Sequence, residues 1–323
     1  EQTQKQLSFR TVYFGGGTPS QLGAENLCRA LDCIDKTADA EVTVECNPSD
    51  LCEEWTQSDM DKLVRYGANR ISMGMQSAVE QERKKLGRRA GAEQVRQAVE
   101  KIKAAGITDF SLDLMLGIPF QTVESVKKSV AFCAESGATH LSAYLLKIEQ
   151  GTPFEKVEQT LNLPNEDECC ELYLTACEEA ERHGFGQYEI SNFAKPGHAS
   201  RHNLIYWNDE EYIGVGAAAH SFYGGKRYYY ERDAKAFADG TKPVADGEGG
   251  DFEEYAMLRL RLTQGLTNQG VQARFGHPIP QKMFETAKPM EALGLVKTDE
   301  NTIRMTPKGF LVSNGIIAQL LGD

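Results

Sequence analysis

The sequence lacks several features that mark common protein classes. Its 323 residues contain no run of 18 apolar residues, which excludes an ordinary membrane-spanning helix, and no signal peptide is recognisable. Basic residues are too few for broad binding to nucleic-acid backbones, because 35 Lys and Arg stand against 47 Asp and Glu, a net charge of -12. What remains is an ordinary globular composition, with 41% hydrophobic and 25% charged residues.

Cysteine is scarce at both ends of the chain. The first 27 residues and the last 146 contain none. No two of the eight cysteines have CxxC spacing, so neither a zinc ribbon nor a disulfide framework is indicated, and we expect a reducing, cytoplasmic setting. The sequence begins at Glu1 rather than at methionine, and its first predicted strand starts at Val12. We therefore expect that an N-terminal piece is missing from it.

Short apolar strands recur through the first half of the chain, separated by segments with helical periodicity. This alternation predicts right-handed βαβ units around a parallel sheet. Asn165 followed by Glu168 predicts the capped start of a further helix that ends before Gly184. The predicted strands are Val12–Phe14, Glu41–Cys46, Arg70–Gln76, Asp109–Leu116 and His140–Leu146.

The predicted strands have one apolar face and one small or polar face. In the fourth strand, for example, Leu112 and Leu114 alternate with Ser111 and Asp113. A doubly wound sheet would be apolar on both faces, so the pattern favours a partial parallel (β/α) barrel with helices outside and a ligand cavity inside. Glu45, Gln76 and Asp113 would project into this cavity, near the loop Gly15–Gly17. The alternative is that they only bond to one another or to serines and threonines of the barrel.

The pattern changes after the barrel. A segment rich in histidine and aromatic residues is followed by a stretch, 239–250, that is dominated by glycine and charge and is interpreted as a linker. Beyond it, Leu258, Leu262 and Leu266 form one helical stripe, and Leu293–Val296 with Thr302–Met305 predict a hairpin. We expect a small, mainly helical, winged-helix-like domain without the basic surface of a DNA-binding protein. The predicted division is 1–193 for the barrel, 194–250 for the segment and linker, and 251–323 for the C-terminal domain.

Several motifs occur together in an order typical of one family. They are Val12-Tyr-Phe-Gly-Gly-Gly-Thr-Pro-Ser20, Glu45-Cys-Asn-Pro48, Ser72-Met-Gly-Met-Gln-Ser77, Leu86-Gly-Arg88 and Asp113-Leu-Met-Leu-Gly-Ile-Pro119. The chain resembles radical S-adenosylmethionine (SAM) proteins of the oxygen-independent coproporphyrinogen III oxidase group. Its later motifs, Tyr188–Phe193, His202-Asn-Leu-Ile-Tyr-Trp207 and Gly216–Ser221, resemble the haem chaperone branch, HemW, with a HemN-type C-terminal domain.

The resemblance implies a set of cofactor-binding residues. Gly16, Gly17 and Thr18 correspond to the loop that meets the methionyl part of SAM. The family positions that hold the amino acid and ribose portions of SAM correspond to Glu45, Gln76, Arg88 and Asp113. Carbonyls and carboxylates suit an ammonium group and ribose hydroxyls, and a guanidinium suits the SAM carboxylate. By itself, Arg88 reads as a solvated member of the basic run Arg83–Arg89.

One departure from the family is large. The family holds a [4Fe–4S] cluster through a CxxxCxxC motif before the glycine loop, and here no cysteine precedes Cys28 and none has that spacing. We therefore expect the cluster only in a longer form of the protein. Whether the chain is an enzyme is left open at this point.

Two functions follow from the resemblance. The first is a chaperone that binds haem and passes it to apoproteins, with His202 as the iron ligand and Tyr206 and Trp207 beside the porphyrin. The alternative is SAM-dependent oxidative decarboxylation of coproporphyrinogen III to protoporphyrinogen IX. The His-Asn…Tyr-Trp motif favours the chaperone. A SAM enzyme acting on RNA is disfavoured by the acidic charge, and partners are expected to be haem and haem-accepting apoproteins, compatible with peripheral membrane association. His202 and Trp207 would otherwise only tie the segment to the barrel.

Overall fold

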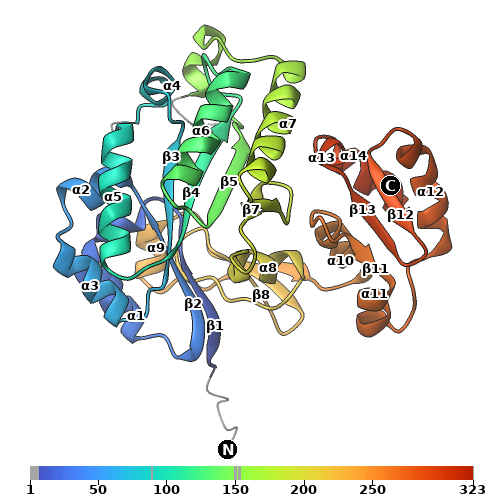
Figure 1. Ribbon diagram of the computed structural model, residues 1–323. Coiled ribbons are helices and arrows are strands. Elements are labelled where there is room, and N and C mark those ends of the chain that lie inside the picture. Colours follow the sequence, from blue (N-terminus) through green and yellow to red (C-terminus); the bar gives the residue numbers. More distant parts are fainter. Residues whose placement is uncertain (1–6, 89, 149–150, 152–153, 323) are drawn as a thin grey trace, which may run out of the picture. The chain divides into compact units, whose positions relative to one another are not determined.

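The computed structural model describes residues 7–88, 90–148, 151 and 154–322 of the chain (Figure 1). They form two compact units. Unit 1 comprises residues up to Gln187 together with Ser191–Ala199, and unit 2 comprises Tyr188–Ile190 and the residues from Ser200 onward. The division predicted at residues 193 and 250 stays a prediction.

Unit 1 is built on a seven-stranded sheet with the order β1-β2-β3-β4-β5-β7-β6. The first five strands are parallel neighbours, and β7 and β6 are antiparallel additions at one edge. The strands are β1 Phe9–Phe14, β2 Lys36–Cys46, β3 Arg70–Gln76, β4 Asp109–Leu116, β5 His140–Leu145, β6 Gly186–Gln187 and β7 Asn192–Ala194. All five predicted strands are confirmed, and the first two begin earlier than predicted.

Helices connect consecutive strands and cover the apolar face of the sheet (Figure 1). Leu112, Leu114 and Leu116 of β4 are buried, as expected for the helix-covered face. The predicted capping box at Asn165 and Glu168 is present and starts the longest helix of the unit. The helices are η1 Pro19–Leu22, α1 Gly23–Asp32, α2 Pro48–Glu53, α3 Gln57–Arg65, α4 Glu80–Lys85, α5 Ala92–Ala104, α6 Val123–Glu135, η2 Glu155–Thr160 and α7 Glu166–Arg182.

From Ser200 onward, unit 2 contains first a short helix and then a three-stranded antiparallel sheet in the order β10-β9-β8. The elements are α8 Arg201–Trp207, β8 His220–Tyr223, β9 Lys226–Tyr229, α9 Ala234–Ala238 and β10 Val244–Glu248. The interpretation of 239–250 as a linker is wrong in part, because β10 lies within it. The reason is that β10 is exposed along its length and is held by backbone pairing with β9, for example of Val244 with Tyr229. A strand of this kind shows no hydrophobic periodicity in the sequence.

The rest of unit 2 is mainly helical around a second small antiparallel sheet, β11-β13-β12. The predicted hairpin is confirmed as β12 and β13. The predicted stripe of Leu258, Leu262 and Leu266 is not one helix, because α10 ends at Arg259 and Leu266 pairs with Ile303 in the sheet. The elements are α10 Phe252–Arg259, β11 Leu266–Thr267, α11 Asn268–Phe275, α12 Gln281–Ala292, β12 Val296–Asp299, β13 Thr302–Met305, α13 Pro307–Phe310 and α14 Ser313–Leu321.

Candidate functional site

The glycine loop follows directly from β1 and is exposed. Gly16 and Gly17 have φ angles of 78° and 69°, in the left-handed region that favours glycine. Gly15 is constrained by space instead, because a Cβ there would lie 2.6 Å from the Tyr13 ring and 3.1 Å from Glu45 Oε1. Thr18 then precedes η1, which has Pro19 at its start. The loop therefore passes closely over the end of β2.

Glu45 is partly buried on the inner face of the sheet. Tyr13 Oη donates to its Oε1 at 2.7 Å, and the main-chain N–H of Gly16 also donates to it. Burial raises the pKa of Glu45, and these two donors oppose that rise. Burial, together with the Glu45 charge, raises the pKa of Tyr13 as well, so the phenol keeps its proton. The carboxylate is thus fixed beside the glycine loop.

Asp113 is surrounded by serine hydroxyls on the same face. Ser111 donates at 2.9 Å and Ser72 at 3.0 Å, and Ser142 is a third donor. Burial raises the pKa of Asp113, and the three hydroxyls and the charge of Arg70 oppose that rise only in part. Two carboxylate oxygens accept about four hydrogen bonds, so the group keeps capacity for a ligand hydroxyl.

Gln76 reaches the same face through an irregularity in β3. Gly74 pairs with Asp113 and Gln76 pairs with Leu114, so Met75 is an extra residue, and Gln76 has a φ of 69°. Its side-chain amide lies over Gly74, where a Cβ would be 2.8 Å from Nε2. Tyr144 Oη donates to Gln76 Oε1 at 3.0 Å.

Arg88 is exposed, on the loop after α4. Burial raises the pKa of Tyr144 on the inner face, and the positive charge of Arg88 opposes that rise. The preceding turn is firmly held: Glu82 accepts from Ser77 Oγ at 2.5 Å, and Arg83 donates to the Ser77 carbonyl at 2.7 Å. Only part of the basic run is therefore solvated, since Arg83 is buried.

The structure places Glu45, Gln76 and Asp113 on one inner face, as the strand alternation predicts. The competing expectation holds for Asp113 alone, which accepts from barrel serines, whereas Glu45 and Gln76 accept from tyrosine hydroxyls. Sequence reasoning missed three of the partners that fix these groups: Tyr13, Ser142 and Tyr144. Extending the same alternation through β1 and β5 would have found Tyr13, Ser142 and Tyr144.

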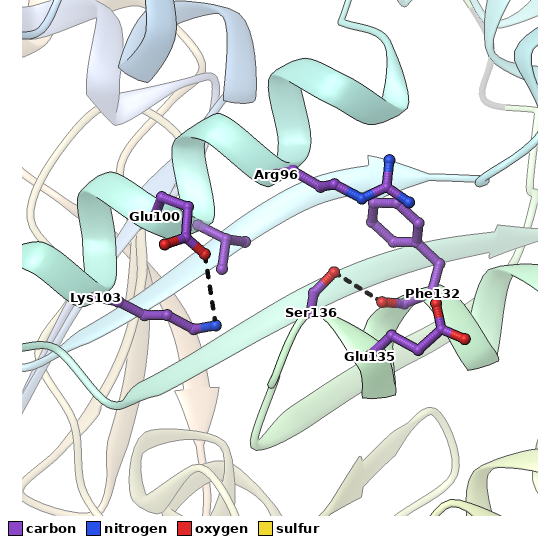
Figure 2. Close-up of a pocket in the computed structure, with 7 residues that line it drawn as sticks. Arg96, Glu100, Lys103, Phe132, Glu135 and Ser136 are labelled. Atoms are coloured by element: carbon purple, nitrogen blue, oxygen red, sulfur yellow. Dashed lines mark hydrogen bonds and ion pairs between the residues drawn. The ribbon is translucent and has the colours of Figure 1, made fainter.

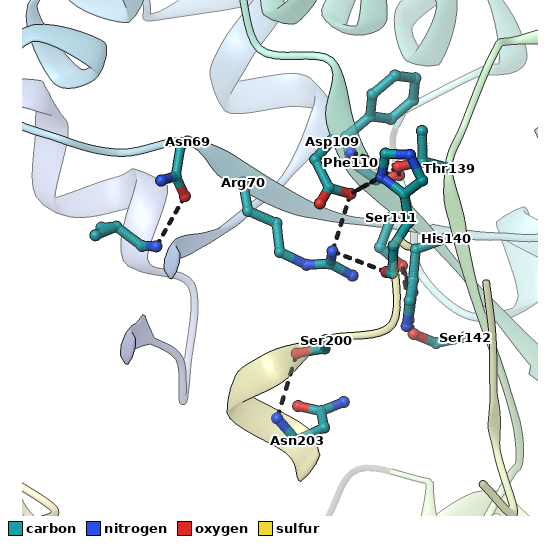
Figure 3. Close-up of polar contacts among 12 residues, drawn as sticks. Asn69, Arg70, Asp109, Phe110, Ser111, Thr139, His140, Ser142, Ser200 and Asn203 are labelled. Atoms are coloured by element: carbon teal, nitrogen blue, oxygen red, sulfur yellow. Dashed lines mark hydrogen bonds and ion pairs between the residues drawn. The ribbon is translucent and has the colours of Figure 1, made fainter. Parts of the chain in front are cut away.

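A second polar layer lies where β3, β4 and β5 begin (Figure 3). Arg70 Nη1 donates to Asp109 at 2.9 Å and to the main-chain oxygen of His198 at 3.2 Å. His140 Nδ1 lies 2.9 Å from Ser111 Oγ, which in turn donates to Asp113. Burial, followed by the charge of Arg70, lowers the pKa of His140 well below its usual value. The inner face is thus polar along its whole length.

The residues on this face fit SAM, because acceptors for an ammonium group and ribose hydroxyls stand beside a loop open enough for a ligand. They do not fit an iron–sulfur cluster. Among the described residues, no group of three or more His, Cys, Asp or Glu side chains converges as a metal site. Burial also raises the pKa of Cys46 and Cys133, which keeps both as thiols rather than metal-binding thiolates.

The predicted haem residues lie on α8 in unit 2. His202 Nε2 is 2.8 Å from Tyr206 Oη, and the rings of Tyr206 and Tyr212 meet edge to face at 4.6 Å. Burial lowers the pKa of His202 to about 4, so the imidazole is neutral at physiological pH. Trp207 is half-buried at the last position of the helix, and no residue of α8 is fully buried.

A separate pocket of about 230 Å³ lies between α5 and α6, on the helix-covered side of the sheet (Figure 2). Arg96 stacks over the Phe132 ring at 4.7 Å, and Glu100, Lys103 and Glu135 add charges of both signs. Because it lies behind the sheet, this pocket is not part of the inner-face site. In the described part of the chain, no helix is long and apolar enough to span a membrane.

Comparison with known proteins identifies the family. Residues 1–133 match the radical SAM superfamily and residues 251–312 the HemN C-terminal domain. Haem chaperone HemW of Bacillus subtilis is 32% identical, over 98% of this chain and 87% of that protein. HemW of Lactococcus lactis is 34% identical, over 97% of this chain and 85% of that protein. The mouse protein "radical S-adenosyl methionine domain-containing protein 1, mitochondrial" is 32% identical, over 96% of this chain and 75% of that protein.

Among solved structures, coproporphyrinogen III oxidase (HemN) from Escherichia coli matches with a TM-score of 0.78 and 20% identity, over 97% of this chain and 78% of that one. This likeness confirms the fold class, a partial parallel barrel followed by a small, mainly helical domain. The relatives confirm the resemblance stated from the motifs. The chain therefore belongs to the HemW haem chaperone family, on the radical SAM fold.

Proposed function

We propose that this chain is a haem-binding chaperone that delivers haem to apoproteins. The observation that carries the proposal is the geometry of α8, where a neutral, partly buried imidazole is grouped with aromatic rings on a helix without a fully buried residue. The relatives named haem chaperones match over nearly the whole chain, this segment included. Partners are therefore haem and the apoproteins that accept it.

The chemistry of α8 suits a porphyrin. Haem is a flat, largely apolar disc whose iron takes axial ligands, and neutral imidazole is a common one. His202 would supply the ligand, while Tyr206 and Trp207 would contact the ring. Tyr206 Oη bonds to His202 Nε2, so ligation through that nitrogen exchanges a hydrogen bond for a bond to iron.

The alternative, decarboxylation of coproporphyrinogen III, gains no specific support from the site. Its solved representative shares only 20% of the sequence, which establishes the fold alone. The inner face of the barrel fits both functions equally well, so it does not distinguish them.

SAM is the second ligand of the proposal. Glu45, Gln76 and Asp113, with Gly16, Gly17 and Thr18, would bind its polar groups, and Arg88 would approach its carboxylate. A [4Fe–4S] cluster belongs to the family resemblance, but the cysteines of this sequence do not offer its motif, and no step here runs through a cluster.

The setting of the proposal is the cytoplasm. All eight cysteines are free, and one of them, Cys33, is exposed, which fits a reducing compartment. We include peripheral contact with a membrane surface, because an apolar cargo partitions into lipid between donor and acceptor.

The test is a haem titration followed by absorption spectroscopy. The wild-type chain should shift the Soret band, and His202→Ala should change that spectrum or weaken binding by about tenfold, the equivalent of roughly 1.4 kcal/mol. Because the pKa of His202 is about 4, the spectrum should stay constant from neutral pH down to roughly pH 5.

His198→Ala and His220→Ala are the matched controls, and both should change the spectrum less. His198 lies in unit 1, and His220 stacks on Tyr229 at 5.2 Å. If His202→Ala leaves spectrum and affinity intact, the ligand lies elsewhere. If the protein decarboxylates coproporphyrinogen III at a useful rate, the enzyme function replaces the chaperone function as the proposal.

A further inference from the structure

The helix that carries the proposed haem residues ends in an uncommon way. Asp209 N–H donates to the Tyr206 carbonyl at 3.0 Å, and Glu210 N–H to the Ile205 carbonyl at 2.9 Å. This is a Schellman motif, whose left-handed residue is usually glycine. Here that residue is Asp209, with a φ of 53°. Because a side chain is disfavoured in this conformation, its presence calls for a reason.

The reason is visible in the side chain of Asp209. It is fully buried, and both of its carboxylate oxygens face arginines. Arg274 of α11 donates to Oδ2 at 2.6 Å, and Arg227 of β9 lies 3.4 Å from Oδ1. Arg274 also donates to the main-chain oxygen of Asp209 at 2.9 Å. One guanidinium therefore holds both the side chain and the backbone at the end of α8.

The neighbouring residue is held in the same manner. Arg259 of α10 donates to the Asn208 side chain, and its other nitrogen bonds to Gln264 at 2.7 Å. Arg227 is itself fixed by Glu254 at 2.5 Å. We call Asn208 and Asp209, with Arg227, Arg259 and Arg274, the α8 clamp. Cations at a helix C-terminus also interact favourably with the carbonyls exposed there.

The clamp matters because α8 is only partly buried. None of its seven residues is fully buried, and Leu204, Ile205 and Trp207 are half-buried, so apolar burial fixes it less firmly than an ordinary surface helix. At its N-terminus, Ser200 caps the helix, with its Oγ accepting from Asn203 N–H at 3.3 Å. At its C-terminal end, two residues beyond Trp207, Asp209 pairs with two arginines.

We infer that the α8 clamp positions the haem-binding helix, and that Arg259 and Arg274 of the C-terminal domain serve this purpose. Asp209 is then a positioning residue, which acts on haem through α8 and does not contact it. The inference rests on the proposed haem function and adds a role for the C-terminal domain, two of whose arginines, Arg259 and Arg274, bond to the end of α8.

The experiment compares Asp209→Asn, Arg274→Gln and the double variant with the wild-type chain. Asparagine keeps the shape and tolerates the left-handed backbone, so Asp209→Asn removes chiefly the charge. Each protein is measured by hydrogen exchange over residues 201–210 and by haem titration. The single variants should exchange faster in α8 and bind haem roughly tenfold more weakly, within the range of typical couplings between sites. The double variant should lose less than the sum, because neither partner is then left buried and unpaired.

The controls remove the same kinds of charge from exposed positions nearby. They are Arg304→Gln on β13 and Glu253→Gln on α10, and neither should change α8 exchange or haem affinity. Arg274→Lys serves if the other variants fold poorly. It keeps the charge but cannot donate to side chain and backbone with the same geometry, so its effect should be intermediate.

The outcomes separate the two proposals. If Asp209→Asn and Arg274→Lys leave both α8 exchange and haem affinity unchanged, the clamp does not position the helix. Faster exchange spread over all of unit 2, with an unchanged Soret spectrum, would also overturn it, since the arginines would then be general stabilisers. A wild-type chain that binds no haem would overturn the proposed function alone, and α8 exchange would still decide the clamp.

Discussion

The inner face of the barrel and helix α8 both carry candidate ligand residues, but they hold them by different means. On the inner face, Glu45, Gln76 and Asp113 each accept a hydrogen bond from a side chain on another strand. On α8, His202 is bonded within its own helix, to Tyr206. The first arrangement comes from the sheet itself, whereas the second depends on what anchors the helix.

This difference predicts different responses to mutation. A site assembled from neighbouring strands is organised before any ligand binds, which reduces the entropy lost on binding. We therefore expect some substitutions on the inner face to change stability and others to change ligand affinity, without one effect following from the other. A site on a weakly packed helix should instead lose affinity whenever its anchor is weakened, as the α8 clamp predicts.

The largest expected effect is on the stability of the barrel. Arg70 is buried and bonds to Asp109, whose side chain is 30% exposed. Arg70→Ala leaves that carboxylate without its cation, which should lower the free energy of unfolding by about 3 kcal/mol, at the low end for a broken buried pair. Thermal or urea unfolding measures it.

The control for Arg70 is Lys84→Ala, which removes an exposed lysine paired with Glu80 on α4. This variant should leave the midpoint of the unfolding transition nearly unchanged. If both variants unfold alike, the polar layer at the start of β3 to β5 is not a firm part of the fold, and the contrast with α8 disappears.

The next effect is on ligand affinity. Asp113→Ala should weaken SAM binding by about 10- to 100-fold, because a charged acceptor for hydroxyl donors contributes roughly 1.5–3 kcal/mol. Isothermal titration with SAM measures it, and Glu124→Ala on the outer helix α6 is the control. Unchanged affinity in a folded variant would reassign Asp113 to barrel packing.

The same residue predicts a dependence of stability on pH. Burial raises the folded-state pKa of Asp113, so its contribution to stability is present at acid pH and is lost as the pH rises through that pKa. Asp113→Asn should therefore raise the melting temperature at neutral pH, with the difference shrinking toward acid pH. A variant that is less stable at neutral pH would show that the three serines already compensate the charge.

How far the sequence predicts the structure differs between the two regions for the same physical reason. Strand alternation is local, so it placed Glu45 and Asp113 on one face correctly. It did not predict the bulge at Met75, because an extra residue in a strand leaves no periodic trace. The clamp was missed altogether, since Asp209 and Arg274 are 65 residues apart and only the folded unit brings them together. The strand β10 was missed because its residues are all exposed.

The smallest expected effect concerns Gly74, and it separates stability from function within the barrel. A Cβ at this position would lie 2.8 Å from Gln76 Nε2, and that amide is the end of a flexible side chain rather than backbone. Gly74→Ala should therefore cost little stability, under about 1 kcal/mol, since alanine also reduces the freedom of the unfolded chain.

The displaced amide would nevertheless lose its alignment with Tyr144. SAM affinity should fall several-fold while the melting temperature barely moves. Gly91→Ala is the matched control for affinity, because nothing lies within 4 Å of a Cβ there, and it should leave SAM affinity unchanged. A loss of stability without a loss of affinity would mean that Gln76 supports the strand rather than the ligand.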